Sequence, residues 1–381
     1  MVIHFHKLVI KTVTWETADT ILVSFDVPEP LKTVFSFLPG QNITIRSVID
    51  GNELRRSYSV CSDPGDELLS IAIREVRDGL FSSWAIRTLI EGHQLEVLPP
   101  TGSFIVQTNA DHRKNYLAIA AGSGITPVYA IIASVLFTEP NSRFVLLYGN
   151  RTQQDIIFRE KLAGLKNRYM DRFVVHHFLS RETTDAEIYN GRLDSDKLNR
   201  INGKLIWPVL ADEVFICGPA EMISGTKGWM LDHGVAEQKI HTELFSVPDA
   251  TGKTPVKNPI PGSTNGDSRN VEKSNTTGSE KNDTNNSPRD CQVTVKADGH
   301  HYVFKLAMDG EKILNAALEH GADLPFSCKG GVCGTCRAKI LQGTVDMELN
   351  YALEPDELAA GYILTCQSHP TSEIVVIDFD S

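Results

Sequence analysis

The stretch Cys328-Lys-Gly-Gly-Val-Cys333-Gly-Thr-Cys336 places three thiols on one glycine-rich loop, and a fourth, Cys366, follows about thirty residues later. This spacing is typical of a [2Fe-2S] site, in which four thiolates hold two bridged irons. Three ligands then come from one loop, while the fourth returns from elsewhere in the fold. The glycines leave room for backbone amides to point at the sulfurs. The loop therefore predicts an iron–sulfur cluster.

Structural zinc and disulfides are the alternatives for these thiols. Zinc sites usually take their cysteines two by two, and a cytosolic chain seldom keeps disulfides. The chain has seven cysteines, and the other three, Cys61, Cys217 and Cys291, stand singly. Residues 1–7 are too short and too polar for a secretory signal. These observations favour the cluster and predict a reducing, cytoplasmic location.

Length and composition indicate an ordinary globular protein of two or three domains. The chain has 381 residues, of which 41% are hydrophobic and 22% charged. Residues 116–137 carry no charge over a length that could span a membrane. Gly, Ser, Thr and Pro interrupt the middle of this segment, which suits a buried strand, a loop and a buried helix better. We therefore expect no membrane span.

The net charge of −11 is distributed unevenly. Residues 291–381 hold 6 Lys and Arg against 13 Asp and Glu, a net charge of −7. Nucleic acid is therefore excluded as an expected partner. The acidic end would suit a basic docking face on a partner protein, although many soluble domains are acidic without such a partner.

Residues 1–110 show short apolar runs broken by turns, which predicts a small antiparallel β-barrel. The expected strands are residues 8–13, 20–27, 41–47, 57–61, 68–75 and 94–98. Tyr58 offers an aromatic face for a ring system, and Arg56 beside it offers a cation for a pyrophosphate. Ser82 lies at the N-terminus of a helix that runs to about residue 90, and anions bind at helix N-termini. Together these residues could hold a flavin, although singly a strand tyrosine usually packs and such a serine usually caps.

Residues 111–245 alternate between strands and helices, which predicts a parallel, doubly wound α/β sheet. The expected strands are residues 116–121, 144–148, 173–179 and 213–216, with helices to about 137, near 155–166 and after 219. Ligands of such sheets bind beyond the carboxyl ends of the strands. Residues 122–127, 148–151, 180–181 and 217–219 fall there. Proline at 127 replaces the third glycine of the usual dinucleotide fingerprint.

Residues 246–290 contain no aromatic residue and no leucine, and Ser, Thr, Asn, Gly and Pro dominate them. Such a segment cannot bury enough surface to fold, and we expect a flexible linker there. Residues 291–381 return to strands, at 292–295, 302–306, 337–341 and 374–379, with a helix at 312–320. They predict a compact α+β domain of about 90 residues around the cysteine loop.

With these motifs assembled, the chain resembles the ferredoxin–NADP reductase superfamily fused to a C-terminal plant-type ferredoxin. The resemblance covers nearly the whole chain. It implies an antiparallel FAD-binding β-barrel, a doubly wound nucleotide-binding domain and a ferredoxin-like β-grasp domain. The closest likeness is to the branch that includes reductases of the phenylacetyl-CoA epoxidase, of other di-iron or Rieske oxygenases and of hybrid-cluster proteins.

The resemblance also implies roles for the flavin motif. In that family the Arg-x-Tyr-Ser motif, here Arg56, Tyr58 and Ser59, holds the FAD ring and pyrophosphate. The Gly-x-x-Ser segment, here Gly79 and Ser82, supports the pyrophosphate from the helix end.

By the same resemblance, the segment from Gly122 through Gly124 to residue 127 contacts the nicotinamide nucleotide, and Thr126 lies near the flavin. Cys217 of Cys-Gly-Pro and Glu243 of His-Thr-Glu-Leu-Phe would flank the nicotinamide during hydride transfer.

Ser180 and Arg181, followed by Tyr189, look like the family's site for the 2′-phosphate of NADP, and Arg151 could assist because a guanidinium suits a phosphate. No acidic residue is expected at that strand end to bind a bare ribose. The sequence therefore favours NADPH as coenzyme, with NADH as the alternative.

Taken together, the sequence predicts an oxidoreductase that passes electrons from NADPH through FAD and a [2Fe-2S] cluster to an oxygenase component. A rival hypothesis keeps the chemistry and changes the acceptor to a hybrid-cluster protein or makes the chain a general ferredoxin-like donor. Another is an iron–sulfur redox sensor without turnover, which would leave Cys217 and Glu243 without a purpose.

Overall fold

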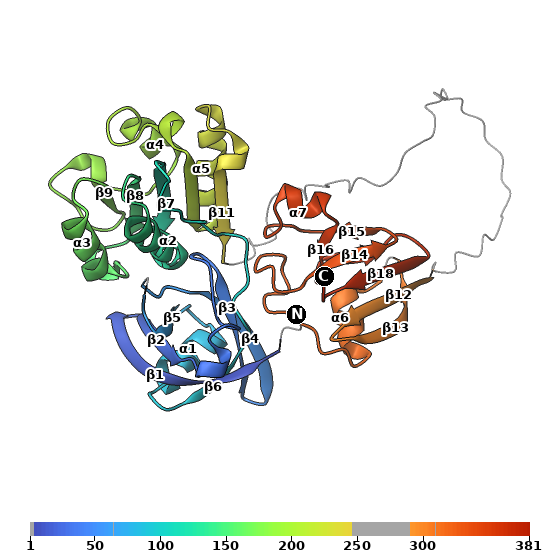
Figure 1. Cartoon of the computed structure of the whole chain (residues 1–381). Coiled ribbons are helices and arrows are strands. Elements are labelled where there is room, and N and C mark those ends of the chain that lie inside the picture. Colours follow the sequence, from blue (N-terminus) through green and yellow to red (C-terminus); the bar gives the residue numbers. More distant parts are fainter. Residues whose placement is uncertain (1–3, 64, 246–289, 309) are drawn as a thin grey trace, which may run out of the picture. The chain divides into compact units, whose positions relative to one another are not determined.

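The computed structural model describes residues 4–63, 65–245, 290–308 and 310–381 (Figure 1). The chain divides into two compact units. One holds the described residues of Ile3–Lys253 together with Pro325–Thr335, and the other holds those of Thr254–Leu324 and Cys336–Ser381. The predicted linker lies outside the described residues, except that Asp290 is the first residue of a strand.

The N-terminal part of the first unit is a six-stranded antiparallel sheet in the order β4-β3-β6-β1-β2-β5. Its strands are β1 (His6–Thr17), β2 (Thr20–Asp26), β3 (Asn42–Ile49), β4 (Asn52–Ser59), β5 (Leu68–Arg74) and β6 (Gln94–Val97). The chain just beyond β4 pairs with β5 through a bridge between Val60 and Ile71, so the two edges of the sheet meet. Helix α1 (Leu80–Thr88) buries Phe81 and Ala85 in the same core. The predicted barrel is confirmed.

The second part of this unit is a five-stranded sheet in the order β11-β10-β7-β8-β9, in which all neighbours are parallel. Its strands are β7 (Asn115–Ala121), β8 (Arg143–Asn150), β9 (Phe173–Leu179), β10 (Glu213–Gly218) and β11 (Ile240–Leu244). The chain leaves β7 toward β8 and β9, and later returns to the other side of β7 with β10 and β11. The strand order therefore reverses between β7 and β10, which is where such sheets bind their ligands.

Helices cover both faces of this sheet, because alternate residues of its strands point to opposite sides. Tyr116 and Ala118 of β7 share a core with α2 (Ile125–Thr138) and with Leu162 of α3 (Arg159–Arg168). Leu117 and Ile119 share another core with α4 (Ser195–Ile201) and α5 (Ala220–Asp232). The remaining short helices of the unit are the 3-10 turns η1 (Glu29–Leu31), η2 (Gly122–Gly124), η3 (Gln153–Asp155), η4 (Glu187–Tyr189), η5 (Pro208–Leu210) and η6 (Glu237–Lys239). The predicted doubly wound fold is confirmed.

The apolar segment 116–137 forms most of β7, the turn η2 and α2, as the sequence predicts. Among the described residues, no helix has both the length and the apolar character needed to cross a membrane. Helix α3 begins at Arg159, later than the predicted 155. Thr152 and Asp155 instead cap the turn η3, and Phe158 takes a left-handed conformation with φ of 60°.

The second unit contains a five-stranded mixed sheet in the order β13-β12-β18-β14-β16 and a separate pair, β15 and β17. Its elements are β12 (Asp290–Ala297), β13 (His300–Ala307), α6 (Ile313–Glu319), β14 (Arg337–Gln342), β15 (Val345–Met347), α7 (Pro355–Ala359), β16 (Tyr362–Leu364), β17 (Ser368–Pro370) and β18 (Ile374–Asp378). The N-terminal and C-terminal strands β12 and β18 pair in parallel at its centre. Ile313, Leu314 and Ala317 of α6 are buried. This is the predicted α+β fold of the ferredoxin type.

Candidate functional site

The reversal of strand order brings the turn after β7 against the end of β10. Gly122 has a φ of +55°, which suits glycine. At Gly124 an added Cβ would lie 2.2 Å from the Cys217 carbonyl oxygen and 2.8 Å from the Gly218 amide nitrogen. Only glycine therefore allows the two backbones to approach this closely. The resulting cradle lies at the carboxyl edge, where parallel sheets bind nucleotides, and the contact of residues 122–127 with a nicotinamide nucleotide stays a prediction.

Cys217 and Glu243 come together at this edge, because they are register partners on the parallel strands β10 and β11. The Cys217 side chain has no solvent exposure. Burial raises the pKa of the Cys217 thiol well above its usual value, and ionisation of the neighbouring Glu243 would raise it further. Burial also raises the pKa of Glu243 to about 8. At neutral pH both groups therefore hold their protons in the ligand-free protein.

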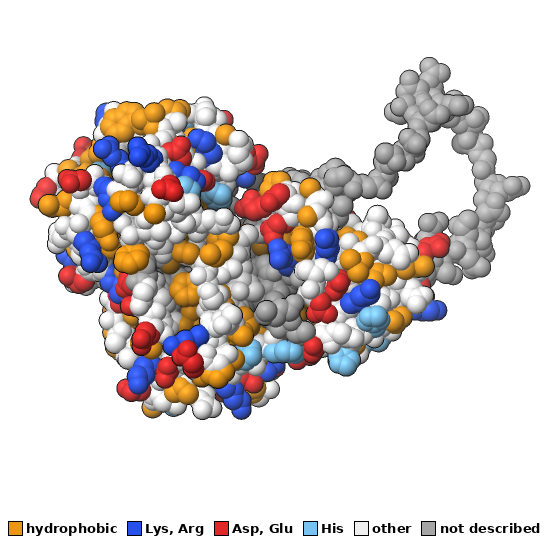
Figure 2. Space-filling model, in the orientation of Figure 1, with side chains coloured by type: hydrophobic (Ala, Val, Ile, Leu, Met, Phe, Trp, Pro, Cys, Tyr) orange, Lys and Arg blue, Asp and Glu red, His pale blue; other side chains and the backbone are white. Residues whose placement is uncertain are grey.

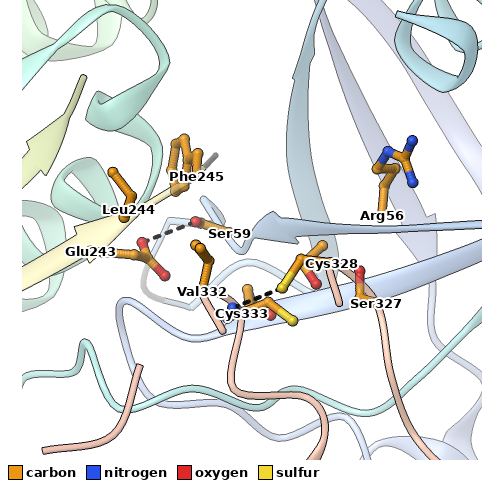
Figure 3. A pocket seen from close by; sticks show the side chains of 11 residues that line it. Arg56, Ser59, Glu243, Leu244, Phe245, Ser327, Cys328, Val332 and Cys333 are labelled. Atoms are coloured by element: carbon orange, nitrogen blue, oxygen red, sulfur yellow. Dashed lines mark hydrogen bonds between the residues drawn. The ribbon is translucent and has the colours of Figure 1, made fainter. Parts of the chain in front are cut away.

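The flavin motif lies on β4, and it reaches Glu243 across the unit. The Ser59 hydroxyl donates a hydrogen bond to Glu243 Oε2 over 3.4 Å (Figure 3). The Tyr58 ring packs on Phe81 with centroids 5.9 Å apart, and burial raises the pKa of its phenol. Arg56 is exposed and donates to the Arg55 carbonyl oxygen over 2.7 Å. The barrel thus presents a hydroxyl, an aromatic ring and a cation beside the nicotinamide cradle.

A cavity of about 280 Å³ lies where these elements meet, and Figure 3 shows side chains from β4, from the end of β11 and from the loop 325–335 around it. Its lining includes Asn42, Arg56, Ser59, Glu243 and Ser327. Asn42 Oδ1 and Ser327 Oγ are buried without a hydrogen-bond partner among the described residues. Unpartnered buried polar atoms are costly and indicate a polar ligand. The cavity therefore fits the polar, aromatic ring system of FAD.

Asn42, Ser327 and Phe245 also line this cavity, and the sequence does not predict them as site residues. Asn42 carried no signal, because a single asparagine at the start of a strand is common. Phe245 belongs to the quoted His-Thr-Glu-Leu-Phe stretch, in which the family resemblance gives a role only to Glu243. Ser327 directly precedes the first ligand cysteine, so its neighbourhood alone could have drawn attention to it.

The hydroxyls of Ser82 and Thr126 are engaged within their own turns. Ser82 Oγ accepts a hydrogen bond from the Val76 amide over 3.0 Å and donates to the Gly79 carbonyl oxygen over 3.4 Å. An added Cβ at Gly79 would lie 2.6 Å from that hydroxyl. Thr126 Oγ1 donates to the Ser123 carbonyl oxygen over 3.0 Å. Both residues shape the helix starts that the prediction assigned to the cofactors, and their contacts with FAD stay a prediction.

The predicted coenzyme-phosphate residues lie at the ends of β8 and β9. Ser180 and Arg181 are exposed, and the Arg181 amide donates to the Arg151 carbonyl oxygen over 2.8 Å. The neighbouring strand ends thus present the two exposed guanidinium groups on adjoining backbone. Glu182 follows directly, and its carboxylate accepts a hydrogen bond from the Gln153 amide over 2.7 Å. The expectation of no acidic residue at this edge is therefore wrong, although that carboxylate is already engaged.

Tyr189 completes this group from the turn η4. Its ring stacks on His176 of β9 with centroids 5.8 Å apart, and its hydroxyl lies 3.2 Å from His176 Nδ1. Burial lowers the pKa of His176, which keeps the imidazole neutral at neutral pH. The histidine therefore fixes the orientation of the tyrosine ring near the strand end.

The cysteine loop holds its first two thiols as a pair. Cys328 Sγ accepts hydrogen bonds from the Gly330 and Cys333 amides, each over 3.4 Å. The hydrogen bond from the Cys333 thiol, together with these amides, lowers the pKa of Cys328 to about 5. Lys329 and Gly331 have φ angles of 53° and 75°, which turn the amides toward the sulfur. The loop is thus already arranged to hold thiolate sulfur.

The other two thiols, Cys336 and Cys366, are both buried in the second unit. The amide and hydroxyl of Thr365 donate to the Cys336 carbonyl oxygen over 3.2 and 3.0 Å. Gln367 Nε2 donates to Cys366 Sγ over 3.5 Å. No three His, Cys, Asp or Glu side chains in the described part of the chain converge as ligands of one metal ion. Cys328 and Cys333 belong to the first unit and Cys336 and Cys366 to the second, so the role of the four thiols as ligands of one cluster stays a prediction.

The loop 325–335 also contacts the barrel within its own unit. Thr335 Oγ1 lies 3.3 Å from Thr44 Oγ1 of β3. The Arg55 guanidinium of β4 lies 3.9 Å from the centroid of the Phe326 ring, a cation–π contact with a buried arginine. These contacts hold the loop at the rim of the cavity that Asn42 and Ser59 line.

Three domain families match successive parts of the chain. The oxidoreductase FAD-binding domain matches residues 7–105, the oxidoreductase NAD-binding domain matches 118–228, and the 2Fe-2S iron–sulfur cluster binding domain matches 295–371. FAD, a nicotinamide nucleotide and a [2Fe-2S] cluster are therefore the cofactors of this chain. The zinc and disulfide alternatives for the cysteine loop are set aside.

Full-length relatives share this arrangement. A protein named as a component of the 1,2-phenylacetyl-CoA epoxidase of Escherichia coli (strain K12) is 43% identical over 99% of this chain and 98% of its own. The 3-ketosteroid-9-alpha-monooxygenase ferredoxin reductase component of Rhodococcus rhodochrous is 33% identical over 98% of this chain and 96% of its own.

A solved structure shows the same fold. Phthalate dioxygenase reductase, described as a modular structure for electron transfer from pyridine nucleotides to [2Fe-2S], matches with a TM-score of 0.53 at 20% identity, over 98% of both chains. The chain therefore belongs to the family of oxidoreductases that join an FAD-binding domain, an NAD-binding domain and a 2Fe-2S domain, the family of its relative in the phenylacetyl-CoA epoxidase.

Proposed function

We propose that this protein is an NADPH-dependent reductase that passes electrons through FAD and its [2Fe-2S] cluster to an oxygenase component of the phenylacetyl-CoA epoxidase type. One observation carries the proposal. The cavity that fits the flavin is lined both by Glu243 of the nicotinamide cradle and by Cys328 of the cluster loop. A donor site and an acceptor site therefore border one cofactor site. The names of the full-length relatives support an oxygenase component as the electron acceptor.

FAD, when bound, accepts two electrons from the nicotinamide and releases them one at a time, which a [2Fe-2S] cluster requires. We infer that Arg56, Tyr58 and Ser59 hold its ring and pyrophosphate, with support from Gly79 and Ser82. Thr126 begins the helix beside it.

The nicotinamide half of the coenzyme would lie in the cradle of Gly122 and Gly124, between the flavin and the pair Cys217 and Glu243. The thiol excludes water because it is fully buried. The protonated carboxyl can donate a hydrogen bond to the nicotinamide amide group. Because it is neutral, it presents no charge to the nicotinamide ring before hydride transfer. The Ser59 hydroxyl orients that carboxyl.

The adenosine half would reach the ends of β8 and β9, where Ser180, Arg181, Arg151 and Tyr189 suit a 2′-phosphate. This placement favours NADPH, with NADH as the weaker coenzyme. The cluster would take Cys328, Cys333, Cys336 and Cys366 as its four thiolate ligands. All seven cysteines are free thiols, which supports a cytoplasmic location.

The test is single-turnover mixing of the purified holoprotein with NADPH without oxygen. Flavin absorbance should bleach first, and the electron paramagnetic resonance signal of a reduced [2Fe-2S] cluster should follow. Adding an oxidised oxygenase component should then remove that signal. If the flavin is reduced and the cluster stays oxidised, or if the oxygenase component takes no electrons, the proposed function is wrong.

A further inference from the structure

One carboxylate in the first unit connects the barrel to two helices of the nucleotide-binding part. Asp63 follows β4, and its Oδ1 accepts a hydrogen bond from the Tyr129 hydroxyl of α2. Its Oδ2 accepts a hydrogen bond from Lys161 Nζ of α3 over 2.9 Å. A single barrel residue therefore anchors α2 and α3 together.

The surroundings make these contacts stronger than an ordinary surface pair. Tyr129 is 2% exposed, and its ring packs on Phe158 with centroids 4.8 Å apart. Lys161 Nζ lies 5.2 Å from the centroid of the Tyr129 ring. Burial opposes the charge of Lys161, but Asp63 outweighs it and raises the pKa of the ammonium group. Charge-assisted hydrogen bonds in partly buried positions are stronger than neutral ones.

The network lies close in sequence to both halves of the site without lining its cavity. Asp63 is on the segment that leaves the flavin motif after Ser59. Tyr129 is one helical turn beyond Thr126, so the two share a face of α2. The hydrogen bond from Ser59 to Glu243 also joins the barrel to the parallel sheet, but both of its residues belong to the candidate site. Asp63 instead holds the start of α2 from outside the site.

We propose that Asp63 is a positioning residue for hydride transfer: by holding Tyr129 and Lys161 it fixes the nicotinamide cradle at the start of α2 relative to the flavin motif of β4. The inference rests on the proposed function only as far as flavin reduction by NADPH. Hydride transfer needs donor and acceptor within a narrow range of distance and angle, so a small displacement is costly. The network would keep that displacement small.

The variants are Tyr129→Phe, which removes one hydroxyl and keeps the ring, together with Lys161→Met and Lys161→Arg. The matched control is Lys114→Met. It removes an ion pair of similar length and exposure, from Lys114 Nζ to Glu213 over 2.8 Å, that lies within the nucleotide-binding part alone. All four are made in the full-length holoprotein.

Two measurements separate positioning from folding. Stopped-flow mixing gives the rate of flavin reduction at saturating NADPH, and calorimetric titration gives the affinity for 2′,5′-ADP, which would contact the nucleotide-binding part only. We expect Tyr129→Phe and Lys161→Met to slow flavin reduction by roughly tenfold to a hundredfold and to weaken the charge-transfer absorbance of the coenzyme complex. Affinity for 2′,5′-ADP should stay unchanged. Lys161→Arg should restore most of the rate, and Lys114→Met should match the wild type.

The inference is overturned if Tyr129→Phe and Lys161→Met reduce flavin at the wild-type rate, or if Lys114→Met slows it equally. Lost affinity for 2′,5′-ADP or lost FAD in these variants would also overturn it, because the network would then hold the fold rather than the geometry. Failure of electrons to reach the cluster would count against the proposed function alone, since this experiment ends at the flavin.

Discussion

Glu243 on β11 and Cys217 on β10 lie side by side as register partners of a parallel pair, and Glu243 also accepts a hydrogen bond from Ser59 of the barrel. The carboxyl group is thereby held by both halves of the first unit. Burial raises its pKa from 4.5 to about 8. A carboxyl group with this shift has a measurable consequence for stability.

We expect the flavin-free protein to lose stability relative to Glu243→Gln as the pH rises from 4.5 toward 8. The folded state binds the proton more tightly than the unfolded state, so the contribution of the carboxyl is fully present below 4.5 and is lost above 8. Urea unfolding of both proteins across this range measures the difference. Glu213→Gln is the control, because the pKa of Glu213 shifts in the opposite direction. Burial raises this pKa less than hydrogen bonds from His241 and Lys114 lower it. A flat difference for Glu243 across the range would contradict the prediction.

Gly124→Ala should destabilise the protein by about 1–3 kcal/mol, because the new methyl would overlap the Cys217 backbone. The displaced cradle should also weaken NADPH binding. Chemical denaturation and coenzyme titration check both effects. Gly228→Ala in α5 is the control, since an added Cβ there meets nothing within 4 Å. It should leave stability unchanged or raise it by about 1 kcal/mol. Equal behaviour of the two variants would show that the close approach is unimportant.

Replacing Ser180 and Arg181 together should weaken NADPH far more than NADH, because only NADPH carries the 2′-phosphate. Each lost charge-assisted hydrogen bond contributes about 1.5–3 kcal/mol, so the preference should shift tenfold or more. Steady-state kinetics with both coenzymes measure this ratio. Glu182→Gln tests the rival role, in which that carboxylate binds a bare ribose: it should leave NADH usage unchanged. An equal loss of both coenzymes in the double variant would refute the assignment.

Cys333→Ser should lose the cluster, because a hydroxyl that stays protonated replaces a soft thiolate. The variant should still bind FAD and reduce ferricyanide with NADPH at a near-normal rate, while electron transfer to an oxygenase component fails. Cluster content and both activities are measured on one preparation. Cys291→Ala, which changes a buried thiol that is no candidate ligand, should keep the cluster. Loss of ferricyanide reduction in Cys333→Ser would exclude a linear path from flavin to cluster.

Much of the fold could be predicted from local sequence patterns. The strand, turn and helix within 115–138 follow from apolar runs and the glycines between them, and β9 follows from apolar residues on both sides of two histidines. Strand β11 was missed because His241, Thr242 and Glu243 are polar and only partly buried, so no apolar run marks it. Helix α4 is only 7 residues long, and the polar residues of its exposed side hide its period.

The site residues could be predicted only where they belong to a short continuous sequence motif. The cysteine loop and the flavin motif each lie within a short stretch, and the family matches confirm the cofactors that they indicate. Asn42 and Ser327 lie 285 positions apart in the sequence and meet only in the fold. Asp63 likewise meets its partners Tyr129 and Lys161 only in the fold, and no sequence spacing predicts these hydrogen bonds. The individual roles of the predicted cofactor residues stay predictions.

The central place of β7 in the sheet separates, in the gene, the residues proposed for coenzyme choice from those proposed for hydride transfer. The chain completes β8 and β9, with the residues proposed for the adenosine half, within one continuous stretch before it returns to build β10 and β11. Replacing residues 143–189 by the corresponding segment of a relative would therefore transfer the residues proposed for coenzyme preference in one step. The glycine turn, Cys217 and Glu243 would remain those of the recipient, so protein engineers could alter the cellular source of electrons without redesigning the reaction. Figure 2 shows Lys and Arg side chains on the face of the nucleotide-binding part that it presents, so the charge of that surface would have to be matched in the exchange.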